Sequence, residues 1–325
     1  MSYAKIKGMG YYVPEKILNN EYMEKIVETN DEWIIQRTGM KERHICREDE
    51  FTTDIGTEAA KKAIEDAGIT PEDVGLIIFA TVTPDYFTPS CACVVQKNIG
   101  AVNSAAFDIN AACSGFVTAL TIAKQFIECG QYEYILVLGA DALSKATDYK
   151  DRGTCILFGD AAGAVVVGKS EKNGIIATDI GAKGSEGDKL TSLAYRYDGA
   201  EIDKRVSHNK STVWMAGSEV MKFAVKTMEQ AGRRVVESAG FTFDDIDLIV
   251  PHQANKRIID GAAKRMGVPT EKVYSNLAKY GNTSSASIPV ALCEAVKTGY
   301  AKEGDKVVLV GFGGGLTWGA ALIEL

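Results

Sequence analysis

Histidine is scarce in this chain, and its cysteines form no regular framework. The 325 residues include three histidines and seven cysteines, and only Cys91 and Cys93 lie close together. One such pair, without a second pair or a nearby histidine, does not make a zinc site. An odd number of irregularly spaced cysteines is typical of reduced thiols rather than of a disulfide scaffold. We therefore expect no bound metal and a cytoplasmic location.

Long apolar runs are missing as well. No uninterrupted run approaches the roughly 20 residues that a membrane-spanning helix needs, and residues 1–16 contain no apolar block of a signal peptide. A net charge of −7 argues against general nucleic-acid binding. With 46% hydrophobic residues, the chain can bury a large core. Its length fits one large domain or two domains of about 150 residues.

The stretch 105–129 organises the chain. A strand-like run at 105–109 leads through small residues around Cys113 into an apolar pattern of helical period over 116–129. Cys113 is therefore expected at a strand-to-helix turn, among side chains too small to cover it. Unpaired N–H groups and the helix dipole at such a turn favour a thiolate. This predicts a nucleophile, the alternative being a cysteine packed in the core.

An internal repeat relates the two halves of the chain. Residues 67–78 recur as 239–250, an offset of 239 − 67 = 172, and further strand and helix patterns keep that offset over some seventy residues. We interpret this as a duplication, with one half at 1–173 and the other at 174–325. Because each half alternates strands and helices, a mostly parallel sheet is expected in each, with helices buried between them.

Other patterns predict single elements. Asn20 is expected to cap a helix that runs to Val27, and residues 29–40 are expected to contain a helix that exposes a Trp and an Arg. The polar stretch 182–211 has little periodicity and is expected to be a long loop. A helix is expected to resume at 217–239.

Two more polar residues are candidates for chemistry. His252 lies two residues beyond the expected buried strand 247–250, and sites in α/β sheets gather at the carboxyl ends of strands. Asn282 precedes the helix that mirrors the Cys113 helix, although its Gly-Asn-Thr-Ser context is also a good turn and helix cap. The offset aligns Cys113 with Ser285, so the two halves would divide the chemistry between them.

Two glycine-rich segments have the spacing of nucleotide-binding loops but not their context. Residues 163–170 match a P-loop, yet three consecutive valines favour a strand. In 311–315, Leu316 follows where a dinucleotide fingerprint needs its third glycine, and a strand is expected at 317–323. Neither segment predicts nucleotide binding.

Five ordered motifs resemble one known family. They are Ala-Cys-Ser-Gly at 112–115, Pro-His-Gln-Ala-Asn at 251–255, Tyr-Gly-Asn-Thr-Ser at 280–284, Gly-Phe-Gly-Gly-Gly-Leu-Thr-Trp-Gly at 311–319, and Glu-Trp-Ile-Ile-Gln-Arg-Thr-Gly at 32–39. The chain resembles β-ketoacyl-acyl-carrier-protein synthase III of the thiolase superfamily, from the first strand to the last residue. The resemblance implies a five-layered αβαβα fold, a homodimer, and an active site of Cys113, His252 and Asn282.

The resemblance implies an acyltransferase that starts fatty acid biosynthesis. Cys113 would take the acyl group of an acyl-CoA, and decarboxylation of malonyl-acyl-carrier protein would then give β-ketoacyl-acyl-carrier protein, CoA and CO₂. His252 and Asn282 would stabilise the enolate, while the Gly314 amide would help to bind the oxyanion and Phe312 would shield the thiol. The family implies no cofactor beyond the two thioester substrates.

Similar enzymes also suggest the binding residues. The residues matching their CoA site are Thr29, Trp33, Arg37, Arg152 and Asn255. Basic residues after His252 could attract the acidic carrier protein, although they would also suit a solvated helix face: Lys256, Arg257, Lys264 and Arg265. Thr88 matches a residue that lines the partner subunit's acyl pocket. Because some of those enzymes have Phe there, we expect this pocket to accept branched or longer starters as well as acetyl.

Several other functions were weighed. A degradative thiolase would carry a second cysteine in the C-terminal glycine motif, which is absent at 311–315. A chalcone-type synthase shares the Cys–His–Asn site but not the typical segment 32–39, and the papain signature is missing. A related condensing enzyme of polyketide or other secondary metabolism remains as an alternative, as does a non-catalytic protein with the thiolase fold.

Overall fold

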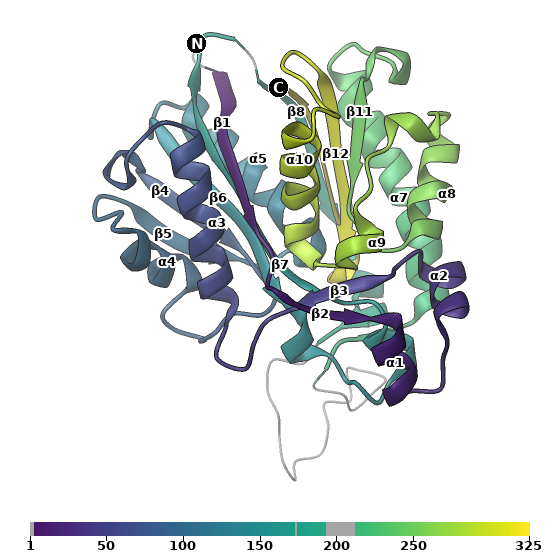
Figure 1. Cartoon of the computed structure of the whole chain (residues 1–325). Helices are drawn as coiled ribbons and strands as arrows, with labels where there is room; N and C mark the ends of the chain where they lie inside the picture. Colours follow the sequence, from purple (N-terminus) through teal and green to yellow (C-terminus); the bar gives the residue numbers. More distant parts are fainter. Residues whose placement is uncertain (1–2, 173, 193–211) are drawn as a thin grey trace.

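The described residues form two large β-sheets, one from each half of the sequence (Figure 1), and two short sheets of two strands each. The structure is a computed structural model that describes residues 3–172, 174–192 and 212–325. The first sheet has the order β1-β7-β6-β4-β5, with bounds β1 Tyr3–Tyr12, β4 Leu76–Ala80, β5 Ala105–Ile109, β6 Tyr134–Ala142 and β7 Asp160–Ser170. The second has the order β11-β12-β13-β8, with bounds β8 Ile175–Ala182, β11 Leu248–Pro251, β12 Lys306–Gly313 and β13 Thr317–Glu324.

The two sheets repeat one mixed topology, and the expected majority of parallel pairs is wrong. β4 pairs in parallel with β5 and β6, and β11 with β12, whereas β1–β7, β6–β7, β12–β13 and β13–β8 are antiparallel. Strands β8, β11 and β12 begin 172 residues after β1, β4 and β6, at 175, 248 and 306 against 3, 76 and 134. At the place of β5, the second half has a single bridge between Ile249 and Val273. The predicted duplication is therefore confirmed in the fold, while the boundary at 173 and 174 stays a prediction.

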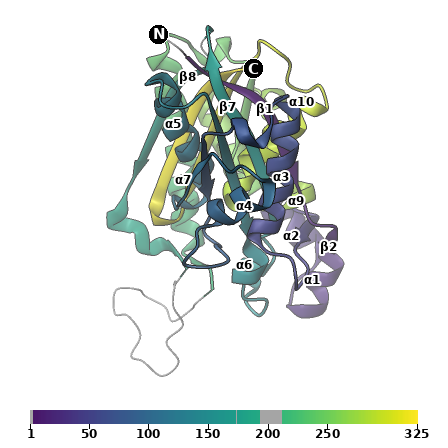
Figure 2. The ribbon, with the colours of Figure 1, turned by 90° about the vertical axis from the view of Figure 1, so that its left-hand side faces the viewer.

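Helices form the other three layers of the fold. The central layer contains α5 (Gly115–Glu128) and α10 (Ser287–Lys297), whose side chains share one core with both sheets. The outer helices α3 (Thr52–Asp66) and α4 (Cys91–Ile99) cover the first sheet (Figure 2), and α7 (Gly217–Ser238) and α8 (Lys256–Met266) cover the second. The predicted five-layered αβαβα fold is confirmed.

Small residues let the central helices approach the sheets closely. A Cβ atom on Gly139 of β6 would lie 2.5 Å from the main-chain oxygen of Ser285. At the duplicated position, a Cβ on Gly311 of β12 would lie 3.7 Å from the main-chain oxygen of Cys113 and 3.2 Å from the Cβ of His252. The start of each central helix is thus pressed against the opposite sheet, which brings residues from both halves together.

The segment before α3 forms a small lobe at the lower end in Figure 1. It contains β2 (Lys16–Asn19), α1 (Asn20–Ile26), α2 (Asp31–Thr38) and β3 (Glu42–Ile45). The expected cap at Asn20 is wrong by one residue, because the Asn19 side chain accepts a hydrogen bond from the Tyr22 amide at 2.9 Å. Asn20 is buried instead, where it bonds the guanidinium of Arg43 and the carboxylate of Asp31.

The polar stretch 182–211 is only partly the loop that was expected. Its described part contains a 3₁₀ segment, η4 (Gly184–Lys189), and β9 (Leu190–Thr191), which pairs with β10 (Trp214–Met215). Residues 193–211, including His208, lie outside the described residues. Two short helices complete the parts of the fold near the site, α6 (Arg152–Cys155) and α9 (Leu277–Tyr280).

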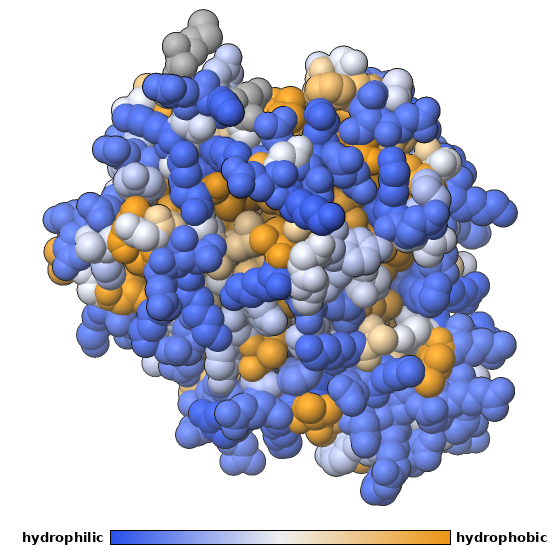
Figure 3. Space-filling model, turned by 45° about the horizontal axis from the view of Figure 1, so that its top comes forward, coloured by the Kyte–Doolittle hydropathy of each residue, from blue (hydrophilic) through white to orange (hydrophobic). Residues whose placement is uncertain are grey.

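The glycine-rich segment 163–170 and the segment 317–323 both lie in strands, β7 and β13, as predicted. Among the described residues, no helix is long and apolar enough to cross a membrane. On the face turned forward in Figure 3, hydrophilic side chains cover most of the surface and apolar ones form scattered groups.

Candidate active site

Two equivalent turns begin the central helices. Ala112 (φ +48°) and Ser284 (φ +52°) adopt the left-handed conformation, which non-glycine residues rarely occupy. Each starts a 3₁₀ turn, η2 (Ala112–Ser114) before α5 and η7 (Ser284–Ala286) before α10. Cys113 lies in the first turn, so the predicted strand-to-helix turn at the nucleophile is confirmed.

The glycine run of the C-terminal motif makes room for this turn. A Cβ on Gly313 would lie 2.6 Å from the Cys113 amide nitrogen and 2.9 Å from the Ala112 Cβ. Such distances require backbone to move, because Cβ atoms do not approach a main-chain nitrogen so closely. The run therefore serves close packing against the nucleophile rather than nucleotide binding.

His252 follows β11 and is held from two sides. Its Nδ1 lies 2.6 Å from the Oγ of Ser287, the first residue of α10, and its ring packs edge-on against Phe312 with centroids 5.4 Å apart. Burial lowers the pKa of His252 to about 3. The imidazole is therefore neutral at ordinary pH.

The hydrogen bonds of Ser287 assign the tautomer of this neutral ring. The Ser287 Oγ accepts a long bond from the Gln253 amide, 3.4 Å, so its own proton is free to be donated to Nδ1 of His252. With Nδ1 as acceptor, the ring proton must lie on Nε2. His252 thereby offers an N–H donor from Nε2.

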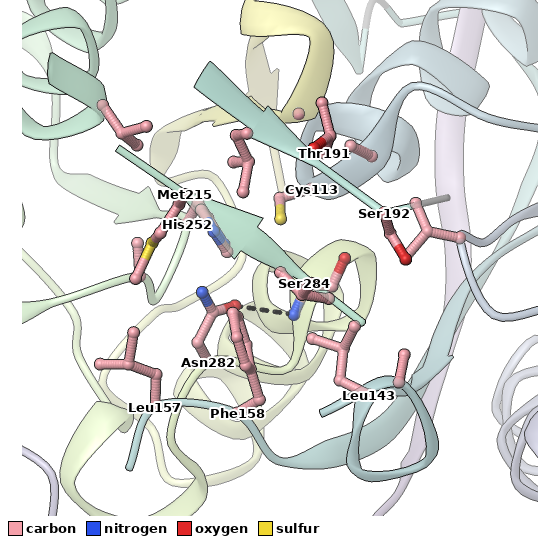
Figure 4. A pocket seen from close by; sticks show the side chains of 18 of the residues that line it. Cys113, Leu143, Leu157, Phe158, Thr191, Ser192, Met215, His252, Asn282 and Ser284 are labelled. Atoms are coloured by element: carbon pink, nitrogen blue, oxygen red, sulfur yellow. Dashed lines mark hydrogen bonds between the residues drawn. The ribbon is translucent and has the colours of Figure 1, made fainter. Parts of the chain in front are cut away.

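Asn282 is oriented by main-chain groups. Its Oδ1 accepts a hydrogen bond from the Ser284 amide at 2.9 Å, and its own main chain bonds Leu157 and Gly159 across to the neighbouring segment. Because Oδ1 is occupied, the NH₂ group is the free end of the side chain. Figure 4 shows this end directed into the cavity that Cys113 and His252 also face.

These side chains open into one large cavity of about 1530 Å³. Predicted site residues from both halves line it: Cys113, His252, Asn282, Phe312, Gly314, Trp33, Arg37, Asn255 and Arg257. Its walls also include the apolar side chains Leu143, Leu157, Phe158, Val213 and Met215. Six predicted residues do not line it: Thr29, Thr88, Arg152, Lys256, Lys264 and Arg265. A polar catalytic end and an apolar wall suit a reactive group attached to a hydrocarbon chain.

The acidity of Cys113 differs from the expectation. Burial raises the pKa of the Cys113 thiol to about 12, the charge of Asp141 adds to this, and the Ser284 hydroxyl acts in the opposite sense. The predicted net preference for thiolate is therefore wrong for the empty site. Desolvation by the surrounding protein outweighs the helix N-terminus.

Trp33 lines the cavity, and two arginines lie close to its ring. The guanidinium carbons of Arg152 and Arg37 are 4.9 and 5.8 Å from the indole centroid. The side-chain amide of Asn255 is hydrogen-bonded at both ends. Its Oδ1 accepts a hydrogen bond from the Arg257 amide (2.9 Å), and its Nδ2 donates one to the Arg37 carbonyl (3.2 Å). The nearby Thr29 Oγ1 is buried without a hydrogen-bond partner among the described residues.

The four basic residues of α8 are all exposed. Lys256 pairs with Asp260 at 2.6 Å and Arg265 with Glu229 at 3.9 Å. Arg257 and Lys264 make no ion pair with any described residue. These two charges are therefore available to a partner.

The loop with Thr88 projects from the molecule. Thr88 is exposed, and the neighbouring Tyr86 and Phe87 are 59% and 73% exposed. Asp85 fastens the loop to α3, because its carboxylate accepts hydrogen bonds from both Thr52 and Thr53. Large exposed aromatic side chains on an anchored loop are typical of an interface.

Sequence reasoning missed three polar residues at the site. They are Ser287, Ser284 and Asp141; the last is fully buried at the end of β6. The partners of Ser287 and Asp141 lie far away in the sequence, Ser287 being 35 residues from His252 and Asp141 being 144 from Ser285, so no local pattern indicates these two. Ser284 lies in the motif at 280–284, which assigned no role to its side chain. Among the described residues, no group of three or more His, Cys, Asp or Glu side chains could hold a metal ion.

Comparison with known proteins gives one consistent result. Residues 107–184 match the family model 3-oxoacyl-[acyl-carrier-protein (ACP)] synthase III, and residues 236–325 match the model of its C terminal part. A β-ketoacyl-[acyl-carrier-protein] synthase III of Caldanaerobacter subterraneus is 52% identical over 99% of this chain and 97% of its own.

Solved structures of similar proteins give the same result as the sequence comparisons. The 3-oxoacyl-[acyl-carrier-protein] synthase III from Aquifex aeolicus is 48% identical, with a TM-score of 0.92 over 99% of this chain and 100% of its own. The priming β-ketosynthase of the R1128 polyketide pathway is 34% identical, with a TM-score of 0.92 over 99% and 96%.

Proposed function

The chain belongs to the 3-oxoacyl-[acyl-carrier-protein] synthase III family, whose members are acyltransferases that start fatty acid synthesis, and we propose that it condenses an acyl-CoA with malonyl-acyl-carrier protein through an acyl-Cys113 intermediate. The observation that supports the roles is the convergence of one thiol with two neutral donors, Nε2–H of His252 and the NH₂ of Asn282, on one cavity. Such donors stabilise developing negative charge without supplying a proton.

The first half-reaction is acyl transfer. The Cys113 sulfur attacks the thioester carbonyl, the carbon–sulfur bond to CoA breaks, and the proton lost from Cys113 ends on the CoA thiol. The amides of Cys113 and Gly314 are suited to hold the oxyanion in between. Phe312 packs against His252 at the cavity and limits access of water.

The second half-reaction is decarboxylative condensation. Loss of CO₂ from the malonyl group leaves an enolate, whose oxygen would accept hydrogen bonds from His252 and Asn282. The carbanion then attacks the acyl carbonyl, and the Cys113 sulfur leaves as thiolate. Because decarboxylation itself generates the carbanion, the step needs no base, and we propose that it needs no cofactor.

The cavity mouth is the proposed entry for both thioesters. Trp33 with Arg37 and Arg152 offers stacking and positive charge to the nucleotide end of CoA. The unpaired charges of Arg257 and Lys264 are suited to an acidic carrier protein. Asn255 would act mainly by joining α2 to α8, because its amide is already bonded at both ends.

We also propose a homodimer that works in the cytoplasm. β5 is an edge strand of its sheet, and the anchored loop beside it exposes Tyr86 and Phe87. An unpaired edge and exposed aromatics together favour pairing with a second copy, which would place Thr88 in the partner's pocket. All seven cysteines are free thiols, which fits a reducing compartment.

Mass spectrometry tests the proposed reaction. Incubation with acetyl-CoA should add one acetyl group, located on Cys113, and Cys113→Ala should take up none. His252→Ala and Asn282→Ala should still be acylated but should decarboxylate malonyl-acyl-carrier protein about 10²–10³-fold more slowly, the cost of one such donor.

Two results would contradict the assignment. Acylation lost as fully in His252→Ala or Asn282→Ala as in Cys113→Ala would mean that the donors serve the first step. A wild-type chain that takes up no acyl group from any acyl-CoA would favour a non-catalytic protein with this fold.

A further inference from the structure

The hydroxyl of Ser284 is buried at the active site without a partner. Only 1% of this residue is exposed, and its Oγ has no hydrogen-bond partner among the described residues. Ser284 lines the cavity together with Cys113, and Figure 4 shows both side chains facing it. A buried hydroxyl left unsatisfied costs free energy, so such a group in an active site calls for a reason.

The turn itself does not need the hydroxyl. At the equivalent position of the first half, Ala112 forms the same turn with nearly the same φ, +48° against +52°. The main-chain amide of Ser284 positions Asn282, and any residue would supply that amide. Ser284 therefore differs from the equivalent residue Ala112 only by its Oγ atom.

The nearest buried acceptor is already served by other donors. Five donor atoms lie within hydrogen-bond distance of the Asp141 carboxylate, two from Ser285 and one each from Thr81, Val82 and Thr83. A carboxylate offers about four lone-pair positions. The Ser284 hydroxyl lowers the pKa of Asp141 as well, but less than the Ser285 hydroxyl and the Val82 amide do. The carboxylate is therefore satisfied without it, and the hydroxyl can serve the cavity.

We propose that the Ser284 hydroxyl donates a hydrogen bond to the Cys113 sulfur when the thiol ionises, and so acts as a catalytic residue of the acylation step. This inference rests on the proposed role of Cys113 as the acylated residue. Hydrogen bonds to a charged acceptor are the strong ones, and this one forms only when the thiolate does. It lowers the energy of the reactive state rather than that of the resting thiol.

The charges around Cys113 make such a donor necessary. Burial and the Asp141 carboxylate both raise the pKa of Cys113, whereas the Ser284 side chain and, to a smaller degree, a main-chain N–H at Cys113 lower it. His252 is neutral because burial depresses its pKa, so it brings no positive charge to the thiolate. Without Ser284, ionisation would depend on main-chain N–H groups.

The test is the pH dependence of iodoacetamide alkylation of Cys113 in Ser284→Gly and Ser284→Ala. Glycine suits a φ of +52° better than serine does, so Ser284→Gly should fold with an unchanged or higher Tm. Between about pH 7 and 9, well below the pKa of Cys113, both variants should be alkylated about tenfold more slowly than wild type, because a pKa about one unit higher leaves about tenfold less thiolate. Acylation by acetyl-CoA at pH 7 should slow by the same factor.

Malonyl decarboxylation supplies the control readout. Both variants keep the main-chain amide that orients Asn282, so decarboxylation should stay within about twofold of wild type. An unchanged alkylation rate in both variants would overturn the proposal, as would a slower rate in Ser284→Gly alone, which would point to the backbone. A lower decarboxylation rate with normal alkylation would instead assign the hydroxyl to the malonyl substrate. Because alkylation needs no acyl-CoA, the alkylation result does not depend on whether the wild-type chain is acylated by acyl-CoA.

Discussion

Burial moves the acidities of Cys113 and His252 in opposite directions, and both shifts favour the uncharged side chain. The pKa of Cys113 rises to about 12 and that of His252 falls to about 3. A neutral thiol and a neutral imidazole do not form the ion pair on which many cysteine enzymes depend. In the proposed reaction, Cys113 and the two donors therefore act separately, one in each half-reaction.

Decarboxylation should be independent of the ordinary titration of histidine. His252 stays neutral down to about pH 3, so malonyl decarboxylation by Cys113→Ala should show no inflection between pH 5 and 8, where a free histidine has a pKa of about 6.5. A fall in rate with a midpoint near pH 6.5 would mean that His252 titrates normally.

The same shift has a consequence for stability. In the unfolded chain, His252 takes up a proton below about pH 6.5, whereas in the folded chain it does not until about pH 3. Its contribution is therefore fully present above pH 6.5 and is lost as the pH falls toward 3. His252→Gln should flatten this part of the pH profile of the unfolding free energy, as measured by urea denaturation.

Ser287 should matter through the tautomer of His252. Ser287→Ala removes the donor to Nδ1, so the ring proton can occupy Nδ1 and Nε2 can lose its role as donor. We expect malonyl decarboxylation to fall by up to about 10²-fold, with acylation of Cys113 unchanged. Ser287→Thr, which keeps the hydroxyl, should recover much of the rate. Equal losses in both half-reactions would indicate a general disturbance of α10 instead.

Single residues were predictable from sequence only where a local motif contains them. Cys113, His252 and Asn282 each lie in an ordered motif that the cavity brings together. The acidity of Cys113 was predicted with the wrong sign, because the helix end is visible in the sequence and the desolvation is not. Ser287 was missed because its hydroxyl meets His252 only after two segments of the chain pack together.

At the scale of elements, the turns and the glycine run form one unit. Gly313→Ala would place a Cβ 2.6 Å from the Cys113 amide nitrogen, so the turn at Cys113 must move. A displacement of about 1 Å at a reacting group can cost about 10²-fold in rate, and we expect that loss in acylation together with a lower Tm. Gly184→Ala is the matched control, because a Cβ there meets nothing within 4 Å; a similar loss in both variants would contradict this reading.

Strands and long helices followed from periodicity, whereas capping and short pairings did not. The runs at 105–109 and 247–250 form strands as predicted, the second shifted by one residue. The choice between Asn19 and Asn20 as cap depended on Arg43, which is fully buried and takes Asn20 as a partner. A two-residue pairing such as β9 with β10 has too few residues to show a period.

At the scale of the whole molecule, we expect the exposed loop with Tyr86 and Phe87 to contact a second copy of the chain in a dimer. Sizing with light scattering should give 2 × 35.0 = 70 kDa. Asp85→Ala releases the loop from α3, and we expect it to weaken the dimer at low concentration, whereas Asp49→Ala, which removes an exposed carboxylate elsewhere, should not. A monodisperse monomer of 35.0 kDa would show that the loop has another role.

The dimer also gives Thr88 its proposed task. If Thr88 enters the partner's pocket, Thr88→Phe should fill space there and lower kcat/KM for hexanoyl-CoA and isobutyryl-CoA more than for acetyl-CoA. Each methylene that no longer fits is worth roughly 1–3 kcal/mol of discrimination. An equal loss with all three substrates would mean that Thr88 does not line the pocket.

The turns η2 and η7 have equivalent backbones, but the equivalent residues Cys113 and Ser285 differ in how deeply they are buried. Ser285 is fully buried and its Oγ lies 2.6 Å from Asp141, whereas Cys113 is only half-buried and lines the cavity. The fold thus contains two copies of this turn, and only the one with Cys113 opens to the cavity. If the proposed acylation takes place, we expect one acyl group per chain at this turn and none on Ser285.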